Sequence, residues 1–239
     1  MILRAILSVS IVIFMVFSTN AQIAIAPELG VGLSSMRFAP NLAYTQDTKS
    51  PLLAGRIGAI ADYYAGNHFY LQAGIHISTK GNYRTFSYYR NDSFSENVRQ
   101  TLNMFYVDAP FTVLFKTGKQ GDIRFFTGLG ITVSYLLGGI NKLHVSGVYA
   151  GTGYDTASNT AIVSGNPVSG FDVGVNITSG IELPTGLYFK VYYTFGVNDI
   201  GLNTEIDKNR IYGIGAGYFL GKSRNINKDT DDLIDKSTN

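Results

Sequence analysis

The sequence lacks cysteine and tryptophan, and only 15% of its 239 residues are charged. Without cysteine, the chain can form no disulfide, can perform no thiol catalysis and offers no attachment point for a lipoprotein anchor. Lysine and arginine together number 19, against 17 acidic residues. Because this balance leaves no broad basic surface, we expect no nucleic-acid partner.

Histidine is scarce as well, since the chain has only His68, His76 and His144. A site that needs several histidine ligands is therefore not expected. The Gly-x-Gly pairs lack the third glycine and the following helix of a dinucleotide fingerprint. We accordingly predict no metal, no cofactor and no catalytic residues.

The N-terminus holds the only long apolar run, from Ile6 to Phe17, behind the positive charge of Arg4. Small residues follow at Thr19 and Ala21, where a signal peptidase reads its site. A run of about a dozen residues is short of the roughly 20 that a spanning helix needs. Residues 1–21 are therefore predicted to be a signal peptide, cleaved near Ala21, rather than a membrane anchor.

The rest of the chain is rich in Gly, Tyr and Phe, with 27, 16 and 15 residues respectively. Its apolar residues alternate with polar ones, as in "GLYFKVYYTFGV" at 186–197, and this period of two is typical of half-buried β-strands. Eight such segments are predicted: 23–34, 52–64, 68–81, 101–117, 122–138, 168–183, 186–197 and 210–221.

Short and long connections between these segments alternate strictly. Turns are predicted at 65–67, 117–122 and 183–186, and long external loops at 35–51, 82–100, 139–167 and 198–209. An even number of antiparallel strands with this asymmetry is typical of outer-membrane barrels. We predict an all-β fold, an eight-stranded antiparallel up-and-down transmembrane β-barrel over 22–221. The charged, aperiodic tail 222–239 is predicted to be disordered in the periplasm.

The larger apolar side chains share one parity of every segment, as Leu187, Phe189 and Val191 do. An eight-stranded barrel has an interior only just wide enough for side chains to fill, so these residues are predicted to face lipid. Aromatic residues near the tight turns are predicted to form a girdle at the periplasmic interface: Tyr63, Tyr64, Phe69, Tyr70, Phe115, Phe125, Phe126, Tyr188 and Phe189. A soluble exported lipid carrier, with the faces inverted, is an alternative.

The opposite parity combines glycine and small polar residues with five acids and five bases. The predicted lumen charge network consists of Glu28, Arg56, Asp62, Lys80, Asp108, Lys116, Arg124, Asp172, Glu182 and Lys190. Charges away from bulk water must pair, and a lumen packed in this way is not an open porin channel. Within the fourth segment, Pro110 removes a backbone donor, so a bulge or local irregularity is expected there.

Two adjoining segments, "FYVDAPFTVLFKTG" at 105–118 and "IRFFTGLGITVSYLLGG" at 123–139, resemble the small outer-membrane β-barrel family of Bacteroidota that includes PorT-like and OmpX-like proteins. The terminal "GAGYFL" at 215–220 resembles the signal read by the barrel-assembly machinery, with Gly215, Tyr218 and Leu220 at its key positions. The resemblance implies an outer-membrane location and the assembly machinery as a partner. It also implies an alternative role as an accessory of protein secretion.

One short stretch, "KLHVSG", is similar to the His-x-Ser pair of outer-membrane lipid A deacylases, with His144 and Ser146 on one face of an extended chain. Gly147 stands where that family has asparagine, and Asp155 is the acid nearest in sequence beyond the pair. A serine needs an adjacent base, and that base an orienting group, before it becomes a nucleophile. A lipid-modifying enzyme is therefore an alternative rather than the prediction.

We predict a monomeric, non-enzymatic outer-membrane protein, in contact with outer-membrane lipid and lipopolysaccharide. Its external loops, chiefly 139–167, are predicted to serve surface binding or envelope maintenance, because recognition is usually placed on loops of a rigid scaffold.

Overall fold

The computed structural model describes residues 23–38, 44–91, 94–119, 121–164, 167–201 and 206–220. The predicted signal peptide, 1–21, and the predicted tail, 222–239, lie outside these residues. The described chain is built of strands, and no helix in it is long and apolar enough to cross a membrane. The strands are β1 (Ile23–Phe38), β2 (Tyr44–Gly66), β3 (Phe69–Asn91), β4 (Phe94–Lys116), β5 (Arg124–Tyr149), β6 (Thr152–Ser164), β7 (Pro167–Val168), β8 (Phe171–Glu182), β9 (Leu187–Gly196) and β10 (Ile206–Tyr218).

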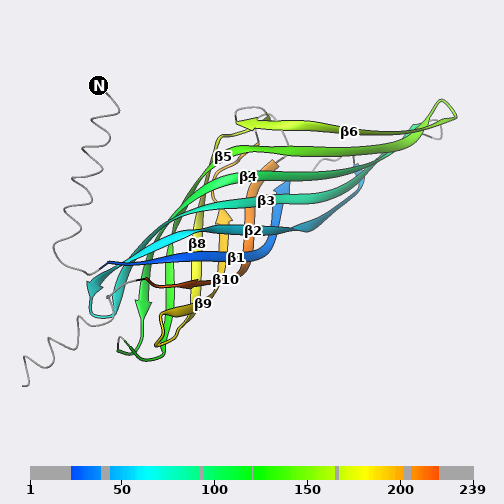
Figure 1. Ribbon diagram of the computed structural model, residues 1–239. Coiled ribbons are helices and arrows are strands. Elements are labelled where there is room, and N and C mark those ends of the chain that lie inside the picture. Colours follow the sequence, from blue (N-terminus) through cyan, green and yellow to red (C-terminus); the bar gives the residue numbers. More distant parts are fainter. Residues whose placement is uncertain are drawn as a thin grey trace, which may run out of the picture.

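Eight of these strands close into a ring in the order β1-β2-β3-β4-β5-β8-β9-β10, with β10 pairing back onto β1. Every pair in the ring is antiparallel. This arrangement confirms the predicted eight-stranded up-and-down barrel (Figure 1). Strands β6 and β7 do not belong to the ring; they lie in the connection between β5 and β8.

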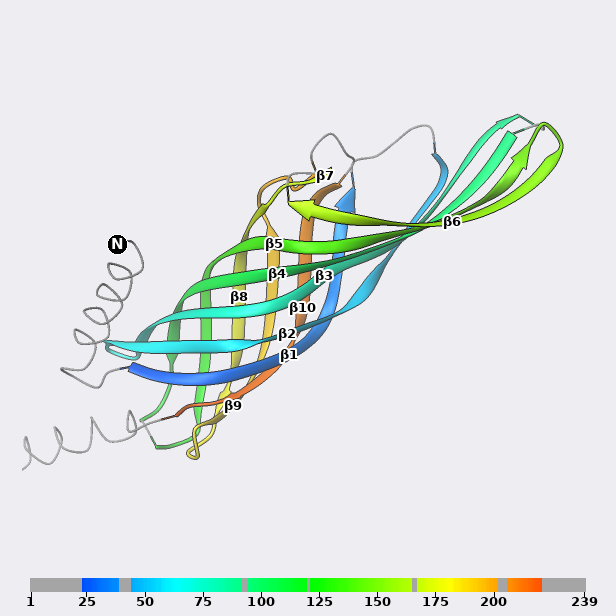
Figure 2. The same ribbon diagram turned by 45° about the horizontal axis from the view of Figure 1, so that its top comes forward.

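One side of the barrel continues into a long sheet that projects beyond the ring (Figures 1 and 2). This projecting sheet consists of the outer parts of β2 to β5 together with β6. One of its rows runs from Ser50 through Tyr83, Thr101 and Lys142 to Asn159. Most of 82–100 and 139–167, and much of 35–51, is therefore strand, and the prediction that these segments are loops was wrong. β6 and the outer part of β5 are half-buried or exposed on both faces along most of their length, so no alternation of apolar and polar residues is required there and the sequence pattern fades.

The outer surface of the barrel carries the larger apolar side chains. Leu29, Ile57 and Leu129 are exposed by 62%, 65% and 59%. The predicted outward orientation of this parity is confirmed, and the inverted faces of a soluble lipid carrier are excluded. An apolar outer surface of this kind suits contact with lipid.

Outward-facing aromatic residues gather at both ends of this apolar surface. Those near the short turns are Tyr63, Phe69, Phe115, Phe125, Phe189 and Tyr218, and those near the opposite end are Phe105, Tyr135, Phe171, Tyr193 and Tyr212. Four predicted girdle residues, Tyr64, Tyr70, Phe126 and Tyr188, lie on the inner face instead. Each is next in sequence to an outward aromatic residue, and successive side chains of a strand leave opposite faces.

Of the bulge or local irregularity expected at Pro110, the structure shows a local irregularity without a bulge. Pairing with β5 runs through Pro110↔Thr132 without a shift, and the shift between these strands lies at Phe105/Tyr106. The irregularity at Pro110 is instead a gap in the pairing with β3, between Ala73↔Phe111 and His76↔Asp108. The missing N–H thus interrupts one ladder locally and leaves the register of the strand intact.

Candidate functional site

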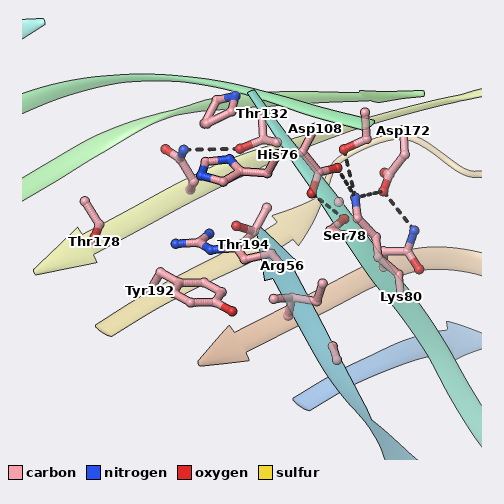
Figure 3. Close-up of a pocket in the computed structure, with 18 of the residues that line it drawn as sticks. Arg56, His76, Ser78, Lys80, Asp108, Thr132, Asp172, Thr178, Tyr192 and Thr194 are labelled. Atoms are coloured by element: carbon pink, nitrogen blue, oxygen red, sulfur yellow. Dashed lines mark hydrogen bonds and ion pairs between the residues drawn. The ribbon is translucent and has the colours of Figure 1, made fainter. Parts of the chain in front are cut away.

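The lumen of the barrel is filled by paired charges, and the first group surrounds Lys80 (Figure 3). The Lys80 ammonium lies 3.1 Å from an Asp108 oxygen and 3.2 Å from an Asp172 oxygen. The Ser78 hydroxyl donates to Asp108 at 2.6 Å, and the Asn209 amide donates to Asp172 at 2.8 Å. One buried cation therefore bridges β3, β4 and β8, with further donors on both carboxylates.

A second group surrounds Glu28 on β1, whose side chain is fully buried. Its carboxylate lies 2.7 Å from the Arg56 guanidinium, 3.2 Å from His76 Nε2 and 2.5 Å from the Lys190 ammonium. The Tyr188 hydroxyl donates to the same carboxylate at 2.6 Å. Donors from β2, β3 and β9 thus converge on one acid, which ties together strands on different sides of the barrel.

A third group lies toward the short turns and combines two acids with two bases. The Lys116 ammonium lies 2.6 Å from Asp62 and 2.8 Å from Glu182. The Arg124 guanidinium pairs with Glu182, and the Gln72 amide donates to Asp62 at 2.7 Å. All ten charged residues named from the sequence therefore lie in the lumen and have an ion-pair partner among themselves. The contact of His76 with Glu28 was not predicted from the sequence.

Apolar side chains close the lumen on either side of the Lys80 and Glu28 groups, and the third charge group lies beyond one of these clusters, toward the short turns. Toward the short turns the cluster is Ala26, Ile60, Leu114, Phe126 and Tyr188, and toward the projecting sheet it is Met36, Leu102, Met104, Tyr106, Leu136, Ile162 and Ile200. The cavity between them has a volume of about 50 Å³. This is room for a few water molecules only. The part of the interior between these two clusters therefore works as a packed core.

The residues of the predicted assembly signal lie at the end of the last barrel strand. Gly215 and Tyr218 belong to β10, and Leu220 forms an isolated bridge with Ile25 of β1. Tyr218 and Leu220 are exposed by 46% and 55% on the lipid-facing side. The segment is thus part of the seam that closes the ring, where the first and last strands meet.

The projecting sheet has an inward-curving face with a small core of its own. Phe86 and Val98 are buried there, and the Arg84 guanidinium donates twice to Asp47, at 2.8 and 3.0 Å. These hydrogen bonds hold the pKa of the Asp47 carboxyl below its ordinary value. A bidentate pair of this geometry fixes the outer part of β2 against β3.

Near the tip, Tyr154 of β6 reaches across β5 to the Glu96 carboxylate of β4 and donates a hydrogen bond to it. This hydrogen bond raises the pKa of Tyr154 to about 12. The ring passes over Gly147, where an added Cβ would lie 3.1 Å from the Tyr154 hydroxyl. The tip is therefore ordered by side-chain contacts between strands that are not neighbours.

His144, Ser146 and Asp155 lie together on the other face of this sheet. The Asp155 carboxylate lies 2.8 Å from His144 Nε2, and Ser146 is the residue directly opposite Asp155 in the register. Both members of the ion pair are open to solvent, with side chains exposed by 44% and 67%. In the described chain no hydrogen bond joins Ser146 to His144, so the serine has no base in contact with it.

The far edge of the projecting sheet is a strand with one open side. β6 pairs with β5 along Thr152–Ile162, and within the described chain its other side pairs only at Val163 and Ser164, with β7. The sequence of this strand, "TGYDTASNTAIVS", holds a single charge and no proline. Its backbone groups are therefore available for pairing with another strand.

A model of a known protein family, described as the outer membrane protein beta-barrel domain, matches residues 17–201. The chain belongs to this family. Membership indicates the bacterial outer membrane as the location of this barrel protein. No curated protein matches the chain.

Solved structures similar to this outer-membrane barrel protein include three small barrels. Neisserial surface protein A is 8% identical with a TM-score of 0.37, and the match covers 81% of this chain and 96% of that chain. The attachment invasion locus protein Ail of Yersinia pestis, in complex with the heparin analogue sucrose octasulfate, is 10% identical with a TM-score of 0.38, and the match covers 83% of this chain and 99% of that chain. The outer membrane enzyme PagL is 13% identical with a TM-score of 0.35, and the match covers 81% of this chain and 98% of that chain. At these identities and TM-scores the likenesses carry no argument about what this chain does.

No group of three or more histidine, cysteine or acidic residues in the described ranges is arranged to hold a metal ion. Two features of the described chain are left as candidate sites: the charged lumen, and the projecting sheet with the open edge of β6.

Proposed function

We propose that this protein is a non-enzymatic surface-binding protein of the outer membrane, in which the sealed barrel is the anchor and the projecting sheet binds the partner. The single observation that carries the proposal is the open edge of β6, at the rim of a sheet that extends past the lipid-facing surface. The mature chain begins after cleavage of the signal peptide near Ala21. Its short turns face the periplasm and its projecting sheet faces the cell exterior, as in other barrels of this kind.

The open edge favours partners that add a strand to the sheet. Natural edge strands are commonly blocked by lysine, proline or a bulge. β6 has none of these over Thr152–Ile162, where its register with β5 is continuous. Main-chain hydrogen bonds to an extended segment would supply affinity, and the side chains on both faces would supply specificity.

The proposal is tested with a photo-crosslinking amino acid placed at Asn159 of the edge, in living cells. Adducts of higher mass are expected, and they should disappear when Ala157→Lys and Ala161→Lys are added to the same edge strand, because charges on an edge oppose pairing. Matched controls, Thr85→Lys and Thr101→Lys, add the same charge to the same face on the central strands β3 and β4. Absence of adducts, or adducts that survive the edge charges, would contradict surface binding through this edge.

A second candidate function is lipid modification, which the His144–Asp155 pair beside Ser146 favours. Its weakness is the lack of contact between the serine and a base, since a nucleophilic serine needs one within hydrogen-bond reach. An altered lipid A acylation pattern in a His144→Ala strain would support the enzyme. An unchanged pattern supports the non-enzymatic role.

A third role, as a PorT-like accessory of protein secretion in Bacteroidota, rests on the sequence resemblance alone. It predicts that deletion of the gene depletes the secreted proteins in the culture medium. Surface binding through the β6 edge predicts that deletion of the gene leaves the secreted proteins unchanged.

A further inference from the structure

The side chains of β6 leave both faces of the free edge open. The strand lies at the rim of the projecting sheet (Figures 1 and 2), and all its residues from Asp155 to Ala161 are exposed. Apart from Asp155, these residues are alanine, serine, threonine and asparagine. A strand of this composition can pair with an identical strand without bringing bulky or like-charged groups together.

Pairing with an identical strand has a preferred register. An antiparallel pair of identical strands has a two-fold axis, on which one residue meets its own counterpart. Ala157 is the middle residue of the segment that pairs continuously with β5, so pairing about Ala157 brings the greatest length of edge into contact. In this register Asp155 lies opposite Asn159 of the second copy, and the only charge of the strand does not meet itself. On the other face Thr156 lies opposite Ser158 of the second copy, a hydroxyl pair that favours pairing of the strands.

The same register supplies an acid for Lys142 on β5. Lys142 is exposed and forms no ion pair within the described chain. It lies directly opposite Asn159, on the face of the sheet that also carries Asp155. Lys142 and Asp155 of the second copy are therefore two strands apart, about 10 Å between their backbones. The long lysine side chain can reach over the intervening asparagine, and the two-fold axis repeats the contact.

We propose that the partner of the β6 edge is a second copy of this chain, paired antiparallel about Ala157, so that the two projecting sheets form one continuous sheet. The inference rests on the proposed function, because it names the partner of the same edge. Main-chain hydrogen bonds supply the affinity, and the two contacts between Lys142 and Asp155 favour this register over its neighbours. The protein is then a dimer, whereas the sequence alone led us to expect a monomer.

The absence of cysteine makes the register directly measurable, since a single introduced thiol can bridge only to another copy. In Ala157→Cys the two thiols meet on the axis, where opposed Cα atoms are about 4.5–5.5 Å apart and a disulfide can form. In the matched control Ala161→Cys they would be roughly 27 Å apart, on the same face and equally exposed. The purified full chain is oxidised in detergent with copper phenanthroline. Disulfide-linked dimer should form at least about tenfold faster in Ala157→Cys.

Two further variants test the register on either side of the axis. A mixture of Ala161→Cys and Gly153→Cys proteins should form the disulfide that neither forms alone, because these residues lie opposite each other. Gly153 accepts a side chain, since the nearest atom to an added Cβ is a carbonyl oxygen 3.9 Å away. In the Ala157→Cys background, Asp155→Lys should slow cross-linking several-fold, and adding Lys142→Asp should restore it.

Equal cross-linking of Ala157→Cys and Ala161→Cys would overturn the proposal, because it would indicate random collision. Absence of the mixed disulfide, or a charge swap that stays as slow as Asp155→Lys alone, would overturn it as well. The gel mobility of unheated against boiled samples verifies that each variant is folded.

Photo-adducts at Asn159 in cells separate this proposal from the proposed function. Adducts with twice the mass of the chain support the second copy. Adducts of another mass, without the disulfide-linked dimer, would exclude the second copy and leave surface binding intact. Absence of both adducts and dimer would contradict the two proposals together.

Discussion

Strands β2 to β5 contribute to both the lumen and the projecting sheet, but their side chains have different surroundings in the two regions. In the lumen, Lys80 of β3 is enclosed by acids from β4 and β8, and apolar clusters shut out the solvent. Four residues further along β3, Arg84 is also buried, but the side chain of its partner Asp47 on β2 is partly exposed to solvent. The comparison shows that one strand can line the packed lumen with its first half and form part of the projecting sheet with its second half.

The largest contrast is expected from removing one cation in each region. Lys80→Met leaves Asp108 and Asp172 buried without their shared partner, and breaking a buried ion pair in this way costs about 3–5 kcal/mol. Lys142→Met, on the exposed face of the projecting sheet, should change the free energy of unfolding by no more than about 0.5 kcal/mol. Urea unfolding, followed by gel mobility, measures both. If Lys80→Met and Lys142→Met changed the free energy of unfolding equally, the lumen charges would be hydrated and the lumen would be open.

Two glycines on β2 sharpen the same contrast between packed and open surroundings. An added Cβ at Gly58, on the inner face, would lie 2.0 Å from the Ile75 carbonyl oxygen, whereas Gly55 has nothing within 4 Å. Gly58→Ala should destabilise the barrel by about 1–3 kcal/mol through overpacking. Gly55→Ala should be close to neutral. A neutral Gly58→Ala in the same urea titration would show that the strands are less tightly packed than described.

A smaller and pH-dependent effect is expected in the projecting sheet, from Asp47. Its lowered pKa means that its contribution to stability is present above 3.8, the ordinary value, and is lost as the pH falls below that value. Asp47→Asn should therefore weaken hydrogen-exchange protection of residues 44–51 at pH 7. After correction for intrinsic rates, the difference from wild type should shrink as the pH is lowered below 3.8. Asp155→Asn at the exposed edge is the control, and a difference that persists at low pH would exclude the charge as its cause.

The barrel could be predicted from the sequence because lipid on one side and a packed lumen on the other impose a period of two. That pattern placed Leu129 outward and Asp108 inward. It could not reveal β6, because nearly every residue of this strand, Asn159 among them, is exposed, and a strand with water on both faces has no such period. Aromatic doublets such as Phe125–Phe126 were misassigned because both rings were counted in the girdle, although alternation along the strand puts Phe125 outward and Phe126 inward.

The site was predictable to a different extent. Sign and parity suffice to name charges that must pair, whereas the partner of each charge depends on the stagger of the strands around the ring, which no local pattern records. The contact between Lys80 and Asp172 joins residues 92 positions apart. The open edge of β6 could not be predicted from the sequence either. It depends on where the chain turns after β5 and on the pairing of β8 with the barrel part of β5.

The most direct test of the account separates the anchor from the presented surface. Residues 84–100 and 143–158 are each replaced by Asn-Gly, a dipeptide that favours tight hairpin turns. The cuts are made at the row Tyr83, Thr101, Lys142 and Asn159, so the pairing below them is preserved. The measurement is the gel mobility of the truncated protein in detergent, unheated against boiled. The account predicts the mobility shift of a folded barrel; a chain that shows no shift, while the full-length protein does, would contradict the division into a self-sufficient anchor and a sheet that it carries.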